Sequence, residues 1–172
     1  AYVTDSAAGA RKMAPAAGGT ATAWVTDALL AGQQGACGPG TGAGFDIGAN
    51  GLVVEADAVY TVNTDKATLI RVPRTGDAAG APALLGAPDC ANLGGADGLR
   101  REGDHFLVAA NRLDKVAQVS TTGVASTVID QGLDFPASLA PWRDGWIGTS
   151  FAYAAAASGG DPHPALFKLV TR

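Results

Sequence analysis

The feature that most constrains the fold of this chain is an internal repeat. Residues 50–76 align without a gap on residues 97–123, so that Asn-Gly-Leu at 50–52 falls on Asp-Gly-Leu at 97–99. Both copies end in a Thr-Gly pair, which is typical of a turn. A repeat of this length indicates that one supersecondary unit is used more than once.

Each copy of the repeat is rich in Val, Leu, Ile, Tyr and Thr, and Gly, Asp and Pro interrupt these runs. Four short strands in about 45 residues is the period of a propeller blade. One blade cannot bury both of its faces alone, so several must stack. The sequence therefore predicts an all-β fold, a β-propeller of four-stranded antiparallel blades. The predicted strands are 51–55, 58–63, 68–73 and 82–86 in the first copy, and 98–101, 105–110, 115–120 and 124–130 in the second.

Partial copies of the repeat flank the two complete ones, and about three to four blades are represented. We expect a single partial propeller domain that is the C-terminal portion of a larger one. Its closing strand would come from a missing N-terminal segment or from another copy of the chain. The predicted segments are 1–27 (partial blade), 28–49 (loop), 50–90 (blade), 91–132 (blade) and 133–172 (final blade without its closing strand).

A β-sandwich with a chance similarity between two hairpin pairs is the alternative fold. The gapless match of strand pattern and turn argues against it. A helical fold is disfavoured, because only residues 152–157 have a helix-forming composition, and Gly159, Gly160 and Pro162 follow directly.

The charge balance excludes some classes of partner. The chain has a net charge of −4 and a pI near 4.9, which argues against nucleic acid and anionic membranes. It contains no uninterrupted apolar stretch of about 18 residues, the length that spans a bilayer.

Two oxygen-bearing side chains occupy equivalent places in the repeat. Asn50 and Asp97 each stand at the start of a predicted inner strand, where successive blades converge on the propeller axis. Amide and carboxylate oxygens suit Ca²⁺ or a similar divalent ion. The alternative is that Asn-Gly and Asp-Gly only form turns. Three further residues near the ends of second strands are interpreted as turn caps: Asp5, Asn63 and Asn111.

The motifs at 48–52, 60–64, 69–73 and 96–99 resemble those of the senescence-marker-protein/gluconolactonase family, which is of the NHL type. This resemblance implies a six-bladed propeller with a divalent metal in its central channel, acting as a lactonase or esterase. It assigns Asn50 and Asp97 to the metal, and Asp97 also to catalysis as general base or nucleophile. Two further ligands of the family have no counterpart here. Ca²⁺ is favoured, with Mg²⁺, Mn²⁺ or Zn²⁺ as alternatives.

Two functions remain open at this point. The first is a metal-dependent hydrolase of lactones or esters. The second is a non-catalytic NHL-type propeller that binds a protein or small ligand through rim loops such as 28–49.

The two cysteines of the chain stand about one blade apart. Cys37 and Cys90 each precede one of the two repeat motifs, so their loops should share a rim of neighbouring blades. A disulfide between them is therefore plausible, and it would suggest a secreted or periplasmic protein. Two unrelated thiols are the alternative.

Overall fold

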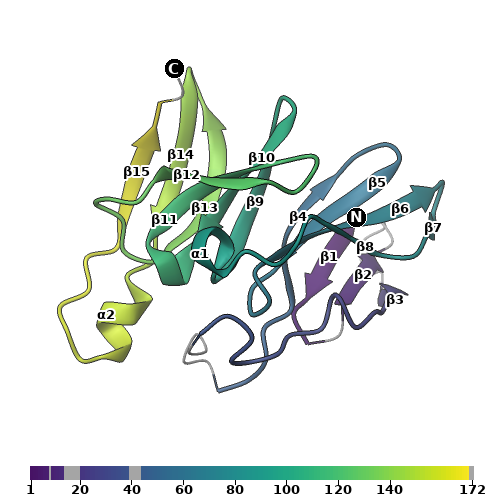
Figure 1. The fold of residues 1–172 in the computed structure, drawn as a ribbon, viewed down its shortest axis with the longest axis horizontal. Helices are drawn as coiled ribbons and strands as arrows, with labels where there is room; N and C mark the ends of the chain where they lie inside the picture. Colours follow the sequence, from purple (N-terminus) through teal and green to yellow (C-terminus); the bar gives the residue numbers. More distant parts are fainter. Residues whose placement is uncertain (8, 14–19, 39–43, 171–172) are drawn as a thin grey trace.

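The computed structural model describes residues 1–7, 9–13, 20–38 and 44–170, and it consists mainly of antiparallel sheets that follow one another along the chain (Figure 1). The first sheet contains β1 (Tyr2–Asp5), β2 (Gly9–Met13) and β3 (Ala21–Val25). The second contains β4 (Ala49–Val54), β5 (Ala58–Asn63), β6 (Thr68–Thr75), β7 (Ala78–Ala79) and β8 (Ala83–Leu85). The third contains β9 (Ala96–Glu102), β10 (His105–Ala110), β11 (Lys115–Ser120) and β12 (Ala125–Ile129). The fourth contains β13 (Pro136–Trp142), β14 (Gly145–Ser150) and β15 (Ala165–Leu169).

Short helical turns join some of these strands. They are α1 (Cys90–Leu93), the 3-10 turn η1 (Asn111–Leu113) and α2 (Tyr153–Ala157). Asp89 caps α1, since its carboxylate accepts hydrogen bonds from the amides of Ala91 and Asn92. The helical composition at 152–157 therefore does form a helix, whereas α1 is too short to show a periodic pattern in the sequence. None of the helices among the described residues is long and apolar enough to cross a membrane.

Apolar side chains fill the spaces between neighbouring sheets. The largest cluster lies between the second and third sheets, where Tyr60 packs on Phe106 with ring centroids 4.8 Å apart. Two smaller clusters involve the first and second sheets, around Leu30 and Ile70, and the third and fourth sheets, around Leu139 and Trp146. Each sheet is stabilised by burying a face against the next sheet, as stacked blades require.

The inner strands of successive sheets lie side by side, with β9 between β4 and β13 (Figure 1). Gly51 allows this close approach, because a Cβ atom there would lie 2.1 Å from the carbonyl oxygen of Asp97. Gly98 plays the same part, since its Cβ would lie 2.7 Å from the carbonyl oxygen of Ala137. Neither glycine has a positive φ. The glycines of the repeated motif therefore serve close packing rather than a turn.

Equivalent backbone hydrogen bonds link the first sheet to the second and the second sheet to the third. The amide of Gly48 donates to the carbonyl oxygen of Ser6, and the amide of Gly95 donates to that of Thr64. Within the second sheet the amide of Thr64 donates to the carbonyl oxygen of Gly48, and within the third sheet the amide of Asn111 donates to that of Gly95. The internal repeat of the sequence is thus a repeat of the structure. The predicted strands of both copies are found within two residues of their expected ends.

A disulfide joins Cys37 and Cys90, the pair expected from the sequence, with 5.2 Å between their Cα atoms. It fastens the long segment before β4 to the start of α1, and so ties the segment ahead of the second sheet to that ahead of the third. The thiols are not free in this structure.

Removing this disulfide should lower the free energy of unfolding by about 2–4 kcal/mol, because cross-linking restricts the unfolded chain. The double variant Cys37→Ser/Cys90→Ser should unfold at a correspondingly lower urea concentration than the oxidised protein. Wild-type protein unfolded in the presence of a reductant should match the double variant. Equal midpoints for oxidised and reduced wild type would contradict this expectation.

Candidate functional site

Asn50 and Asp97 lie at irregular points of their inner strands. The register of β4 against β5 shifts between Ala49 and Leu52. The register of β9 against β10 shifts in the same way between Ala96, which pairs with Ala110, and Leu99, which pairs with Val108. In each case two residues of the inner strand stand opposite one residue of its partner. Such bulges re-aim side chains and are common next to active sites. Both residues lie inside a strand, so the interpretation of these pairs as simple turns is wrong.

The structure brings Asn50 and Asp97 to the same pocket, which has a volume of about 230 Å³. The polar lining residues lie at the ends of strands of the second and third sheets, and the aromatic ones lie next to β13 and β14 and at the start of α2. The lining residues are Ile47, Asn50, Thr64, Asp97, Asn111, Phe135, Phe151 and Tyr153.

Hydrogen bonds orient Asn50. Its Nδ2 donates to Oγ1 of Thr64 over 3.1 Å, and this hydroxyl donates to the carbonyl oxygen of Ala96 over 2.7 Å. Thr64 is almost fully buried. The chain of bonds links β4, the end of β5 and the start of β9, so the Asn50 amide is fixed relative to the strand that carries Asp97.

The carboxyl group of Asp97 is half-buried between two amides. Burial raises its pKa to about 6, while hydrogen bonds from Asn111 and Asn50 act to lower it. Nδ2 of Asn111 lies 3.5 Å from Oδ2 of Asp97. Desolvation therefore outweighs the amide donors. A carboxyl group with a pKa raised to about 6 is better suited to act as a general base than an ordinary aspartate.

The donor set of this pocket fits a hard divalent cation. Asn50 and Asn111 carry amide oxygens and Asp97 a carboxylate, which are ligands that Ca²⁺ accepts. Oδ1 of Asn111 is buried and has no hydrogen-bond partner. A buried carbonyl-type oxygen without a partner is costly, and a cation would satisfy it after a rotation of the amide. Among the described residues no group of three or more His, Cys, Asp or Glu side chains is placed to hold a metal. A cation here would thus rely on amide oxygens and one carboxylate.

Asn111 has a different role from the one its sequence context predicts. Expected to cap a turn, it starts η1 and lines the pocket beside Asp97. Thr64, which the sequence pattern does not single out, occupies the equivalent place one sheet earlier, as their matching backbone hydrogen bonds show. The sequence repeat already indicates that Thr64 and Asn111 are equivalent, because position 64 aligns on position 111. Asn63 does cap a turn, with Oδ1 accepting from the amide of Lys66.

Both histidines lie away from this pocket. His105 begins β10, and its ring contacts the carboxylates of Glu102 and Asp104, each at 3.2 Å. His163 lies in the exposed segment between α2 and β15, 3.6 Å from Asp161. Neither residue lines the pocket that contains Asp97.

Comparison with known proteins identifies the fold. No family model matches this chain, and no curated protein sequence matches it. Among solved structures, a luciferin-regenerating enzyme has a TM-score of 0.60 and 15% identity over 73% of this chain and 47% of the enzyme. A chain of a nidogen/laminin complex has a TM-score of 0.51 and 17% identity over 72% of this chain and 51% of its own. Virginiamycin B lyase from Staphylococcus aureus has a TM-score of 0.50 and 12% identity over 72% of this chain and 42% of the lyase.

The chain folds as part of a β-propeller. The likeness to these structures extends over about half of their length, between 42% and 51%. At 12–17% identity it concerns the fold alone, and two of the three proteins are named as enzymes of different kinds. The expectation that the remainder of a propeller lies outside this chain stays a prediction.

Proposed function

We propose that this protein is a divalent-metal-dependent hydrolase of lactones or esters, with its metal at Asn50 and Asp97. The observation that carries the proposal is the convergence of Asn50, Asp97 and Asn111 on one pocket, with an unsatisfied buried oxygen at Asn111. Ca²⁺ is the ion that this oxygen-only set favours. We propose that the other ligands come from further blades of the propeller, from water or from the substrate.

Three side chains of this chain would have separate roles in metal binding and catalysis. Asn50, fixed by Thr64, and Asn111 would contribute amide oxygens, and Asp97 a carboxylate. A bound divalent ion supplies a Lewis acid that polarises the substrate carbonyl. Asp97 accepts the proton of the attacking water, or attacks the carbonyl carbon itself. In the first case a C–O bond forms to the water oxygen, the lactone or ester C–O bond breaks, and the proton held by Asp97 passes to the departing alkoxide. In the second case the alkoxide leaves and takes a proton from water as an acyl-aspartate anhydride forms, and water then hydrolyses this anhydride to the carboxylic acid and free Asp97.

The test is a hydrolysis screen of lactones and carboxylic esters before and after chelation of divalent ions. We expect activity to disappear with chelator and to return with added Ca²⁺. Asn50→Ala should raise the Ca²⁺ concentration for half-maximal rate at least about tenfold and lower the maximal rate less, since one ligand is lost. Asn92→Ala, an asparagine of α1 outside the pocket, is the matched control. Hydrolysis that survives chelation would contradict the proposal.

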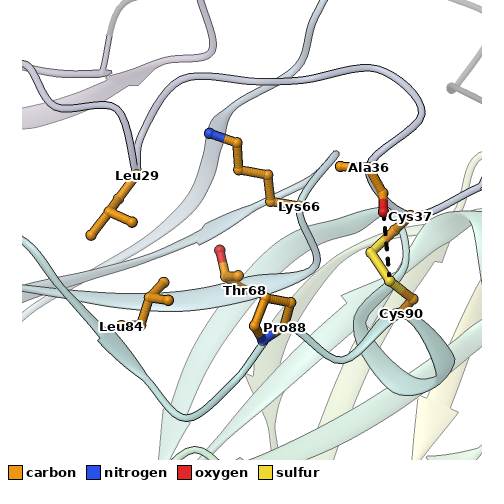
Figure 2. Close-up of a pocket in the computed structure, with 8 residues that line it drawn as sticks. All are labelled: Leu29, Ala36, Cys37, Lys66, Thr68, Leu84, Pro88 and Cys90. Atoms are coloured by element: carbon orange, nitrogen blue, oxygen red, sulfur yellow. Dashed lines mark hydrogen bonds between the residues drawn. A yellow bond between two sulfur atoms is a disulfide. The ribbon is translucent and has the colours of Figure 1, made fainter.

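A second function is supported by a separate pocket, to which residues of the 28–49 segment contribute (Figure 2). It has a volume of about 240 Å³ and is lined mainly by apolar atoms beside the Cys37–Cys90 disulfide. Oγ1 of Thr68 is buried there without a hydrogen-bond partner. Figure 2 shows Leu29, Lys66 and Leu84 around it. Such a pocket favours a propeller that binds a small apolar ligand with one polar atom. Ligand binding insensitive to chelator and to Asp97→Asn would favour this alternative.

The disulfide also supports a proposal on location. Structural disulfides persist in oxidising compartments, and the Cys37–Cys90 bond therefore favours a secreted or periplasmic protein.

A further inference from the structure

In the pocket that contains Asp97, the residues contributed by the fourth sheet are apolar where those of the second and third sheets are polar. Ala137 of β13 stands where Asn50 and Asp97 stand in the two sheets before, because all three follow the first residue of an inner strand at a register shift. A methyl group thus replaces an oxygen-bearing side chain at the third equivalent position.

The same change occurs at the ends of the second strands. The amide of Phe151 donates to the carbonyl oxygen of Phe135, just as the amide of Asn111 donates to Gly95. Phe151 is therefore the equivalent of Asn111, and Phe135 is the equivalent of Gly95. Around the pocket, polar groups on the second and third sheets give way to two phenyl rings on the fourth.

Phe135 occupies its place at a conformational cost. Its φ is +55°, whereas the equivalent Gly95 has a φ of +75°. A bulky residue in the left-handed region costs about 1–3 kcal/mol and persists where other contacts hold it, commonly at ligand sites. Here the Phe135 amide donates to Oδ1 of Asp114 over 2.7 Å. A glycine would satisfy the backbone at lower cost, so the packing of the Phe135 ring, which is only 9% exposed, must outweigh this cost.

Tyr153, the first residue of α2, completes an aromatic wall with these two rings. Its ring centroid lies 5.4 Å from that of Phe135 and 6.0 Å from that of Phe151. The rings of Phe151 and Tyr153 are nearly parallel, with 2° between their planes. Phe151 is nevertheless 60% exposed. An exposed, oriented ring that borders a pocket is a surface for stacking rather than core packing.

From this division of the pocket we infer that the aromatic wall of Phe135, Phe151 and Tyr153 binds the apolar part of the substrate. The substrate class is then esters or lactones that carry an aromatic or alkyl group, rather than polyhydroxylated lactones. The carbonyl would lie toward Asn50 and Asp97, and the apolar group would lie against Phe151 and Tyr153. This inference rests on the proposed hydrolase function for the reacting carbonyl.

Binding of stable amides separates this inference from the hydrolase proposal, because amides keep the carbonyl but are not turned over on the timescale of a titration. Phenylacetamide, acetamide and D-gluconamide would be titrated by calorimetry into the Ca²⁺-loaded protein and into the chelated protein. We expect phenylacetamide to bind at least about tenfold more tightly than either of the others, since stacking and apolar burial contribute only there.

Substitutions in the wall locate the binding. Phe151→Ala and Tyr153→Ala should each weaken phenylacetamide binding at least about fivefold and leave acetamide unchanged. Trp142→Ala is the matched control, because Trp142 is a 48% exposed aromatic at the opposite end of the same sheet. Equal affinity for phenylacetamide and D-gluconamide, or equal affinity of wild type and both wall variants, would overturn the inference even if Ca²⁺-dependent hydrolysis is found. Selective phenylacetamide binding without Ca²⁺-dependent hydrolysis would support the wall as a binding site and reject the hydrolase.

Discussion

Replacing Asp97 by asparagine is expected to reduce hydrolysis at least about 100-fold, because the variant loses both the general base and the anionic ligand. The same change should stabilise the metal-free protein at pH 7 by about 2 kcal/mol, since the variant no longer has to ionise a desolvated carboxyl group. Burial raises the pKa of Asp97 to about 6 from its usual value near 3.8. Loss of activity together with a gain in stability is the combination expected of a functional residue held in an unfavourable environment.

The pH dependence of this stabilisation follows from the direction of the shift. Between pH 3.8 and about 6 the folded protein binds more protons at Asp97 than the unfolded chain does, so wild-type stability falls as the pH rises through this window. Well below pH 3.8 the group is protonated in both states. Urea unfolding at about pH 3 and at pH 7 after chelation should therefore show the advantage of Asp97→Asn only at pH 7.

Asp144→Asn provides the matched control for this experiment. Asp144 is an exposed carboxylate in the turn between β13 and β14, 3.2 Å from Lys168, and its pKa is lowered rather than raised, by a backbone hydrogen bond within its own residue and by Lys168. This variant should keep its activity and should not gain stability at pH 7. A variant Asp97→Asn that is no more stable than wild type at pH 7 would contradict the buried, desolvated state of the carboxyl group.

A single methyl group at Gly51 should destabilise the protein by about 2–3 kcal/mol, because it has no space between β4 and β9. The Cβ of Gly51→Ala would lie 2.1 Å from the carbonyl oxygen of Asp97 and 2.6 Å from the amide nitrogen of Leu99. Both contacts are with backbone, so no side-chain rotation relieves them. The inner strands must move apart, and this movement also separates Asn50 from Asp97.

Both the urea concentration at the unfolding midpoint and the affinity for Ca²⁺ should be lower in Gly51→Ala than in wild type. Gly160→Ala is the control, since its nearest heavy atom would be 3.2 Å away and its φ is not positive. That variant should unfold within about 1 kcal/mol of wild type. Equal stability of Gly51→Ala and wild type would show that the inner strands are not packed as closely as described.

Much of this fold could be predicted from the sequence because it repeats. The match of residues 50–76 to 97–123 is enough to locate two blades and to align Asn50 with Asp97. The fourth sheet departs from the pattern, since Ala137 and Phe151 replace the polar residues of the motif. The equivalence of these residues to those of the earlier sheets can therefore be recognised only from the backbone hydrogen bonds of the structure.

The candidate site was only partly predictable, for reasons of local chemistry. Asn111 follows a strand, where asparagine commonly caps a turn, and its contact with Asp97 depends on how two strand ends meet. The glycines at 51 and 98 could mean a turn or a close approach, and only the neighbouring strand decides between them. The raised pKa of Asp97 depends on burial, which no single residue type encodes.

The most direct test of the central claim is calorimetric titration of Ca²⁺ into the chelated protein at pH 7.5 and at pH 5, for wild type, Asp97→Asn and Asp144→Asn. The account predicts one site in wild type and in Asp144→Asn, none in Asp97→Asn, and an affinity that is weaker at pH 5 because protons compete for Asp97. Absence of binding in wild type, or equal binding by Asp97→Asn, would contradict a metal site at Asn50 and Asp97.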